Sequence, residues 1–211
     1  MGYQPPDNND PPKAEEPDLA GTYSARDYFS WTFEGLVELI KGKIHKMTPA
    51  PATDHQRLVG RLYSCLTAPL AGRQCEVWLS PFDVYLVKPG EDYRETRNIV
   101  EPDLCIVCDP DKIRKFGCVG SPDFIIEILS PSTAAKDAGA KLQLYEEYGV
   151  KEYWMVSYTE KLVFVNILND QGNYVPEKPK TASSIISPRD FPEVKIDLKT
   201  LFKNLTTHTE L

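Results

Sequence analysis

Two acidic residues and one lysine stand where metal-assisted hydrolysis would need them. Asp103 opens one apolar run, at 104–107, and Glu127 lies inside a second, at 124–129; Lys141 follows in the next segment. Carboxylates on two neighbouring strands can hold Mg²⁺ or Mn²⁺, with water filling the remaining coordination positions. A lysine beside them can orient or deprotonate the attacking water and offset the charge that develops on a phosphate. The pattern indicates metal-assisted hydrolysis at a phosphate.

Simple lengths place the lysine level with Glu127. Glu127 lies two residues before the end of its apolar run, which is roughly 7 Å at the rise of a β-strand. Lys141 lies about six residues into a helix expected over 134–148, which is roughly 9 Å at the helical rise. Because such a helix folds back along the strand, we expect the amine beside the carboxylate.

Longer motifs resemble a known family. They are Glu101-Pro-Asp103, the run PDFIIEILSPST from Pro122 to Thr133, the pair Asp137 and Lys141, the run YEEYGVKEYW from Tyr145 to Trp154, and the earlier matches Glu38–Gly42 and His55. Over residues 29–205 the chain is similar to the bacterial family known as "putative restriction endonucleases" (Uma-two type), within the PD-(D/E)XK nuclease superfamily. The resemblance implies an α/β fold with a restriction-endonuclease-like mixed central β-sheet flanked by helices. It also implies a metal-dependent phosphodiesterase whose catalytic acids are Asp103 and Glu127.

One position departs from the superfamily pattern. That pattern places its lysine two residues after the glutamate, and this sequence has Leu129 there. The resemblance places the missing amine on the following helix, at Lys141; without a lysine near the acids, only metal binding would remain. Glu38 and His55 also match positions that the family carries, so the resemblance makes each of them a candidate extra ligand or phosphate contact.

Each candidate residue also has a purely structural interpretation. Asp103 could be a strand-entry residue that satisfies backbone donors. Glu127 needs a partner in any case, because burying an unpaired carboxylate costs several kcal/mol, by rough estimate. Lys141 and Asp137 are spaced for an exposed ion pair on one helix, worth about 0.3–0.5 kcal/mol. His55 could simply begin an amphipathic helix on its polar side.

The five cysteines are Cys65, Cys75, Cys105, Cys108 and Cys118. Their odd number and low density favour free thiols in a reducing compartment, and hence a cytoplasmic protein. Cys105, Cys108 and Cys118 resemble half of a zinc site. However, Cys105 and Cys108 would lie on opposite faces of a continuous strand, and no fourth ligand stands nearby. No run approaches the roughly 20 apolar residues of a membrane helix.

Length and composition fit one globular domain, with 211 residues of which 41% are apolar and 26% charged. The net charge of −7 excludes a generic polycation that coats nucleic acid, but not an enzyme that gathers carboxylates around a metal ion. Residues 1–22, rich in proline and acids, predict a disordered tail before a domain at 23–211. The basic residues Lys112, Arg114 and Lys115 predict a solvated loop, with a phosphate guide as the alternative.

Other periodicities predict the elements around the candidates. Residues 37–47 alternate on both sides of a Lys-Gly turn near Gly42, which predicts a hairpin, and leucines at helical spacing predict a helix capped by Asp54. Further expected elements are a helical entry at 29–37, strands at 77–79, 82–87, 104–107 and 124–129, the helix at 134–148 capped by Ser132 or Thr133 and ended by Gly149, paired strands at 152–157 and 162–168, and a last strand and helix near 194–203.

Together these features predict an endonuclease that cleaves nucleic acid, with DNA the expected substrate and Mg²⁺ or Mn²⁺ the cofactor. Asp103 and Glu127 would hold the metal and Lys141 would position water, with Glu38 and His55 as further candidates. The resemblance also suggests a homodimer, and no membrane association is expected. One alternative is a catalytically inactive, nuclease-like module that binds nucleic acid or a partner. Another is a hydrolase with paired acids, such as a glycosidase, which would not need Lys141.

Overall fold

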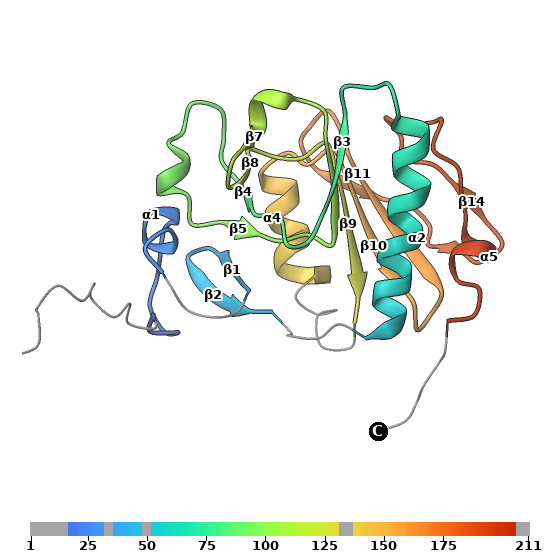
Figure 1. Ribbon diagram of the computed structural model, residues 1–211, viewed down its shortest axis with the longest axis horizontal. Helices are drawn as coiled ribbons and strands as arrows, with labels where there is room; N and C mark the ends of the chain where they lie inside the picture. The colour runs from blue at the N-terminus through green and yellow to red at the C-terminus, as the bar shows by residue number, and fades with distance from the viewer. Residues whose placement is uncertain (1–16, 32–35, 48–51, 131–136, 206–211) are drawn as a thin grey trace, which may run out of the picture.

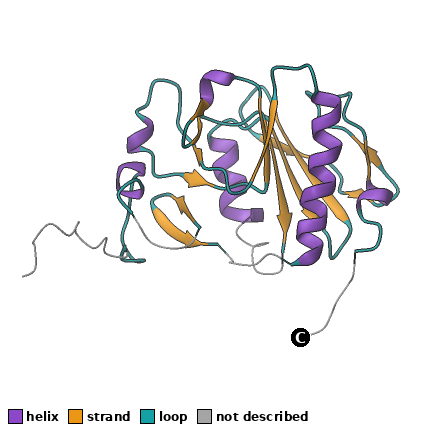
Figure 2. Ribbon diagram, viewed as in Figure 1, coloured by secondary structure: helices purple, strands orange, loops and turns teal. Residues whose placement is uncertain are grey.

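The computed structural model describes residues 17–31, 36–47, 52–130 and 137–205. A central sheet lies between the helix α2 (Thr53–Leu70) on one side and the helix α4 (Leu142–Glu147) with a smaller second sheet on the other (Figure 1). Figure 2 shows the same layers coloured by secondary structure. The predicted fold class, a mixed central sheet flanked by helices, is confirmed.

The central sheet is mixed because one of its pairings is parallel. Its strands are β3 (Glu76–Leu79), β6 (Leu104–Val107), β9 (Phe124–Leu129), β10 (Glu152–Ser157), β11 (Leu162–Leu168), β12 (Tyr174–Pro176) and β13 (Lys180–Thr181). They lie in the order β12-β11-β10-β9-β6-β3, with β13 beside β11. β9 and β10 run parallel. The chain crosses between them through the π-helical turn η3 (Asp137–Lys141) and α4, the kind of connection that parallel strands require.

The smaller sheet contains the predicted hairpin. Its strands are β1 (Val37–Ile40), β2 (Lys43–Lys46), β4 (Val84–Tyr85), β5 (Ile99–Val100), β7 (Ile113–Arg114) and β8 (Gly117–Val119), in the order β2-β1-β5-β4-β8-β7. Lys41 and Gly42 join β1 to β2 with φ of 52° and 79°, the left-handed pair that a tight hairpin turn needs. The strand expected at 82–87 is shorter, since only Val84 and Tyr85 find ladder partners, on β5 and β8.

Helix α2 carries the leucine stripe that its sequence predicts. Leu58, Leu62 and Leu66 are fully buried along it. The predicted start is wrong by two residues: Ala52 occupies the N-cap position without a side-chain cap, and Asp54 lies inside the first turn. There its carboxylate accepts a hydrogen bond from Arg57 Nη1 at 2.7 Å, because the i, i+3 spacing places the two side chains on one face of the helix.

The first helix lies upstream of its predicted position. α1 spans Ala25–Tyr28, and Val37 already belongs to β1, whereas a helical entry was expected at 29–37. A capping box between Ser24 and Asp27 sets the start of α1, which is a stronger local signal than the aromatic residues that follow it. Residues 32–35 lie outside the described part of the chain.

The remaining elements follow the sequence more closely. Gly149, with φ of 75°, ends the helical segment as predicted, while the expected caps Ser132 and Thr133 fall at 131–136, outside the described residues. The short elements are η1 (Tyr93–Glu95), η2 (Pro110–Lys112), β14 (Ile185–Ile186), β15 (Ile196–Asp197) and α5 (Leu198–Leu201). The last two confirm the strand and helix expected near 194–203.

The strands β3, β6, β9, β10 and β11 divide their side chains between two cores. In β9, Ile126 and Ile128 pack with the leucines of α2. Ile125 packs on the opposite face with residues of α4 and the smaller sheet. Because side chains alternate along a strand, Glu127 lies on the same face as Ile125. This alternation directs the one acidic residue of β9 into the layer between the two sheets.

A disulfide joins Cys75 to Cys108 and corrects the expectation that all thiols are free. β3 and β6 pair with Glu76 opposite Val107, so the residues just beyond this pair face each other. Cys65, Cys105 and Cys118 are free. The described residues contain no cluster of three or more His, Cys, Asp or Glu side chains placed to hold a metal, and Cys108 is already bonded, so the half zinc site is not formed.

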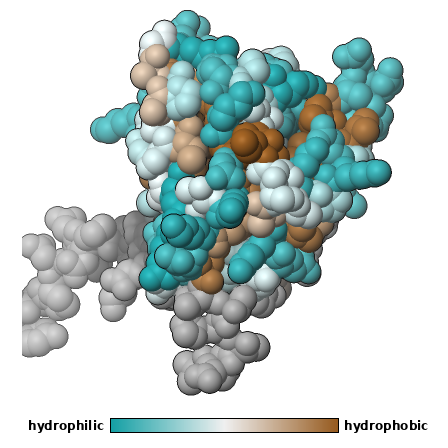
Figure 3. Space-filling model, turned by 90° about the vertical axis from the view of Figure 1, so that its right-hand side faces the viewer, coloured by the Kyte–Doolittle hydropathy of each residue, from teal (hydrophilic) through white to brown (hydrophobic). Residues whose placement is uncertain are grey.

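Apolar residues are scattered over the part of the surface that Figure 3 shows. Figure 3 shows the side of the molecule on the right of Figure 1, where apolar residues form small separate patches among hydrophilic ones, as on most protein surfaces. None of the helices within the described ranges is long and apolar enough to cross a membrane. Of the tail predicted at 1–22, residues 1–16 lie outside the described part of the chain.

Candidate active site

The two acids predicted from the sequence meet at one end of the central sheet. β6 and β9 are antiparallel neighbours with Leu104 opposite Ile126, so the preceding Asp103 lies level with Glu127. The Asp103 backbone N–H donates to Glu127 Oε2 at 3.4 Å. In return, the Ile128 N–H donates to Asp103 Oδ2 at 2.7 Å. Two residues 24 positions apart in the chain are thereby held side by side.

Lys141 reaches this pair of acids from the crossover connection. Its Nζ lies 2.6 Å from Glu127 Oε1 and 2.6 Å from Glu38 Oε1. All three side chains are almost completely buried, with exposed fractions of 2%, 5% and 0% for Lys141, Glu127 and Glu38. The structure thus places the amine that is absent at position 129 beside the glutamate, as the length estimate predicts. The alternative partner Asp137 has a side chain outside the described ones.

Glu38 comes from the smaller sheet and connects it to the cluster. It lies in β1, where all residues are buried, and its Oε1 also accepts a hydrogen bond from the Glu101 N–H at 3.1 Å. The sequence placed Glu38 among the candidates through the family resemblance alone. The structure gives it a definite contact, because it shares the Lys141 amine with Glu127.

His55 completes the surroundings of Asp103. Its Nε2 lies 3.1 Å from Asp103 Oδ1 and 3.2 Å from Oδ2, and both side chains are mostly buried. His55 stands in the first turn of α2, so the helix aims it at the end of the sheet. Among the described residues its Nδ1 finds no hydrogen-bond partner. The imidazole therefore holds the carboxylate in place through one nitrogen.

Glu101 is a buried acid that the sequence pointed to only as part of the motif Glu101-Pro-Asp103. It is 2% exposed, and its Oε2 has no hydrogen-bond partner within the described ranges. Burial, followed by the charges of Asp83 and Glu38, raises the pKa of its carboxyl from 4.5 to about 7. An acid directly before a proline at a strand entry was the available signal. What the sequence could not show is that this side chain faces the same layer as Glu38.

The cluster is electrostatically costly and is held by its own partners. Burying an ion costs several kcal/mol, to order of magnitude, and only close opposite charges and hydrogen bonds offset that cost. Lys141 provides one positive charge for the two glutamates, and Tyr145 OH donates to Glu127 Oε1 at 2.9 Å. Among the described side chains, Asp103, Glu38 and Glu127 are three carboxylates beside one ammonium group, a balance that suits a cation.

The donor set fits a hard divalent ion. Mg²⁺ binds oxygen ligands and is usually held by one or two carboxylates together with several waters. Asp103 and Glu127 supply two adjacent carboxylates of this kind. The described residues contain no ready-made cluster of three metal-binding side chains, so these two acids are the protein ligands that the geometry offers.

Replacing Tyr145 with phenylalanine tests how far the buried network depends on neutral donors. We expect a loss of about 1.5–3 kcal/mol in the free energy of unfolding, since the lost hydrogen bond ends on a buried carboxylate. The ring contact with Tyr153 at 4.9 Å is kept. Urea unfolding measures the change. Tyr63→Phe, on the partly exposed surface of α2, is the matched control and should stay within about 0.5 kcal/mol; equal losses in both variants would contradict the expectation.

Three comparisons place the chain among known proteins. A family model described as "putative restriction endonuclease", Uma2, matches residues 26–199. The uncharacterized protein slr1290 of Synechocystis sp. (strain PCC 6803) is 28% identical over 155 residues, which are 72% of this chain and 77% of that protein. The crystal structure of a "putative nuclease belonging to DUF820" from Anabaena variabilis ATCC 29413 matches with a TM-score of 0.66 at 18% identity, covering 85% of this chain and 97% of that one.

The structural likeness shows a shared fold. The family match goes further, because it runs from α1 to α5 and so includes the elements that carry Glu38, His55, Asp103, Glu127 and Lys141. The chain therefore belongs to the Uma2 family of restriction-endonuclease-like proteins.

Proposed function

We propose that this protein is a metal-dependent endonuclease that hydrolyses phosphodiester bonds of nucleic acid, with DNA as substrate and Mg²⁺ or Mn²⁺ as cofactor. The observation that carries the proposal is the position of Lys141 Nζ, 2.6 Å from Glu127 Oε1, where Glu127 adjoins Asp103. Paired carboxylates that can hold a divalent ion, with an adjacent amine to orient water and offset charge, suit hydrolysis of a phosphodiester. Membership of the Uma2 family supports the same activity.

Each residue of the cluster has a distinct role in this proposal. Asp103 and Glu127 would hold the ion through their carboxylates. When bound there, a divalent ion supplies a Lewis acid that polarises the phosphate and lowers the pKa of water. Lys141 orients the attacking water and offsets charge that develops on the phosphate. His55 keeps the Asp103 carboxylate in position.

Glu38 acts through Lys141. Its carboxylate provides a second anchor for the amine besides Glu127, so that the ammonium group keeps a fixed place when the charge on Glu127 is shared with a cation. We therefore assign Glu38 a positioning role. A homodimer would supply two such sites for the two strands of a duplex, and light scattering of the purified protein tests that part of the proposal.

Cleavage assays test the proposed activity directly. We expect the wild type to nick or cleave plasmid DNA in Mg²⁺ or Mn²⁺, and EDTA or the substitution Glu127→Gln to abolish the reaction. Glu160→Gln, an exposed carboxylate in the turn after β10, is the matched control and should cleave like the wild type. Equal cleavage by the wild type and Glu127→Gln would end the assignment.

A metal titration separates the nuclease from an inactive nuclease-like module. In calorimetry, Mn²⁺ should bind the wild type and lose its site in Asp103→Asn. Binding of DNA without any Mn²⁺ binding or cleavage would instead support the module, in which the loss of the lysine at position 129 has removed turnover.

A further inference from the structure

A cavity of about 450 Å³ lies beside the acid cluster, between β3 and the β7–β8 hairpin. Its volume falls in the range of about 300–1,000 Å³ that is typical of small-molecule sites. Six of the side chains that line it carry the argument: Trp78, Phe82, Glu101, Arg114, Lys115 and Phe116. They provide aromatic walls, two buried polar atoms and a basic rim.

The aromatic walls suit a flat ring. Trp78 and Phe82 are stacked, with ring centroids 4.3 Å apart and planes within 8° of parallel. Phe116 lines the cavity from the connection between β7 and β8. Aromatic side chains of this kind stack on nucleobases, and the stacking tolerates different bases because every base has a π face.

Two buried polar atoms that belong to residues lining the cavity lack partners among the described residues. They are the indole N–H of Trp78 and Oε2 of Glu101. A buried donor or acceptor without a hydrogen bond is costly, and a base edge offers both the acceptor and the donor that would satisfy them. Glu101 is 2% exposed and both atoms are buried, so a base edge that bonds to them requires the two side chains to turn toward the cavity.

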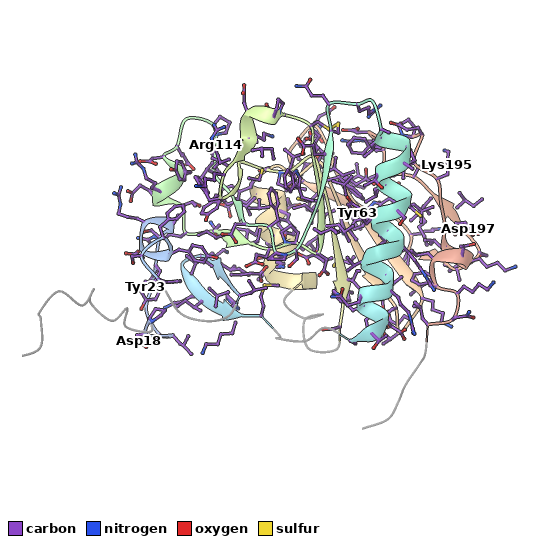
Figure 4. The ribbon with its side chains drawn as sticks, viewed as in Figure 1. Asp18, Tyr23, Tyr63, Arg114, Lys195 and Asp197 are labelled. Atoms are coloured by element: carbon purple, nitrogen blue, oxygen red, sulfur yellow. A yellow bond between two sulfur atoms is a disulfide. The ribbon has the colours of Figure 1, made fainter. Side chains whose placement is uncertain are left out.

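The charges around the cavity favour a base inside and phosphates outside. Asp83 and Glu101 both line the cavity, and their carboxyl groups would repel a phosphate placed within it. Arg114 and Lys115 line the same cavity but are exposed to solvent. Figure 4 shows Arg114 on the smaller sheet, on the side of the molecule away from Lys195 and Asp197.

The cavity adjoins the proposed catalytic cluster. Glu101 lies two residues before Asp103, and its backbone N–H donates to Glu38 Oε1 at 3.1 Å. A nucleotide whose base occupied the cavity would therefore bring its own phosphates near the carboxylates.

We propose that this cavity binds one unstacked nucleobase of the nucleic-acid substrate, while Arg114 and Lys115 hold the neighbouring phosphates. The inference rests on the proposed nuclease function, which makes nucleic acid the ligand. It adds a place where the strand is gripped through a base rather than through its backbone alone.

Binding of two single-stranded 12-mers with equal charge tests the proposal. One carries mixed bases and the other is abasic at every position; both are fluorescently labelled and titrated in EDTA, so that no cleavage occurs. We expect the wild type to bind the base-bearing strand at least about tenfold more tightly, as stacking and hydrogen bonding to a base imply. Equal affinity for the two strands would overturn the proposal.

Four variants assign the effect to the cavity. Trp78→Phe removes the N–H and keeps a ring, and Glu101→Gln keeps the shape of the side chain. Each should weaken binding of the base-bearing strand about three- to tenfold and leave the abasic strand unchanged. Arg114→Ala/Lys115→Ala should weaken both strands alike and lower the salt slope by about 1 to 2. Lys195→Ala/Lys199→Ala, on the far side of the molecule, should change neither.

The outcomes distinguish this proposal from the nuclease function. If the wild type cleaves DNA but both cavity variants bind the base-bearing strand like the wild type, the cavity proposal fails and the nuclease stands. If the wild type does not cleave but the base preference is present and falls in Trp78→Phe or Glu101→Gln, the nuclease fails and the cavity stands. Thermal unfolding of each variant confirms that the binding change does not come from a lost fold.

Discussion

Replacing Lys141 with methionine is expected to lower the free energy of unfolding by about 3–5 kcal/mol, the usual effect of removing one partner of a buried ion pair. Glu38 and Glu127, both almost fully buried, would then face each other without the ammonium group that lies 2.6 Å from each. Urea unfolding at pH 7 measures the loss. Under the proposed function, cleavage should fall to the background level as well, because Lys141 is the group assigned to orient the water.

A matched, exposed lysine shows whether burial of the ion pair causes the loss of stability in Lys141→Met. Lys151 pairs with Asp123 at 2.7 Å, but its side chain is 51% exposed, and surface pairs of this kind contribute about 0–1 kcal/mol. Lys151→Met should therefore change stability little. A similar loss in both methionine variants would show that the central triad is no more than an ordinary ion pair.

A combined variant separates charge from packing. In Lys141→Met/Glu38→Gln/Glu127→Gln all three charges of the triad are absent, so neither glutamate of the triad is left buried as a charge without its counter-charge. Much of the stability lost in Lys141→Met should return, as happens when buried ion pairs are replaced by neutral groups, while cleavage should stay absent. A triple variant as unstable as the single one would assign the loss to the shape of the side chain.

Glu101→Gln is expected to stabilise the protein at neutral and alkaline pH. The pKa of the Glu101 carboxyl is raised from 4.5 to about 7 in the folded state, so the native protein binds this proton more tightly than the unfolded chain. Its contribution to stability is fully present below about pH 4.5 and is lost as pH rises through 7. Over that window the free energy of unfolding of the wild type should fall by about 3 kcal/mol, because each pKa unit corresponds to 1.36 kcal/mol. The unfolding free energy of the glutamine variant should not change in this way.

Unfolding curves at pH 5, 6, 7 and 8, recorded in EDTA, check this expectation. The difference in unfolding free energy between Glu101→Gln and the wild type should grow with pH up to about 7 and then level off. Glu160→Gln, at an exposed position, supplies the baseline. A difference that stays constant from pH 5 to pH 8 would mean that Glu101 does not titrate in this range.

Local patterns were sufficient for much of the framework. The alternation of β1 and β2 around Gly42, the leucine stripe of α2 and the apolar runs of β6 and β9 each depend on neighbours within a few residues, so they can be derived from the sequence. The level positions of Glu127 and Lys141 also follow from the rise of a strand and a helix. The start of α1 was misplaced because the Ser24–Asp27 capping box sets it upstream of the aromatic residues, and the start of α2 because its N-cap, Ala52, carries no side-chain cap.

Pairings between distant segments were decided by tertiary structure. Glu38 shares the Lys141 amine only because the smaller sheet packs against the central one, and the disulfide between Cys75 and Cys108 follows from the register of β3 and β6. The His55 contact with Asp103 spans 48 residues of chain. No period in the sequence encodes such contacts, since they depend on how layers stack. The sequence alone determined which residues could do the chemistry and which elements carry them, whereas the packing of two sheets around one buried lysine decided which of them meet.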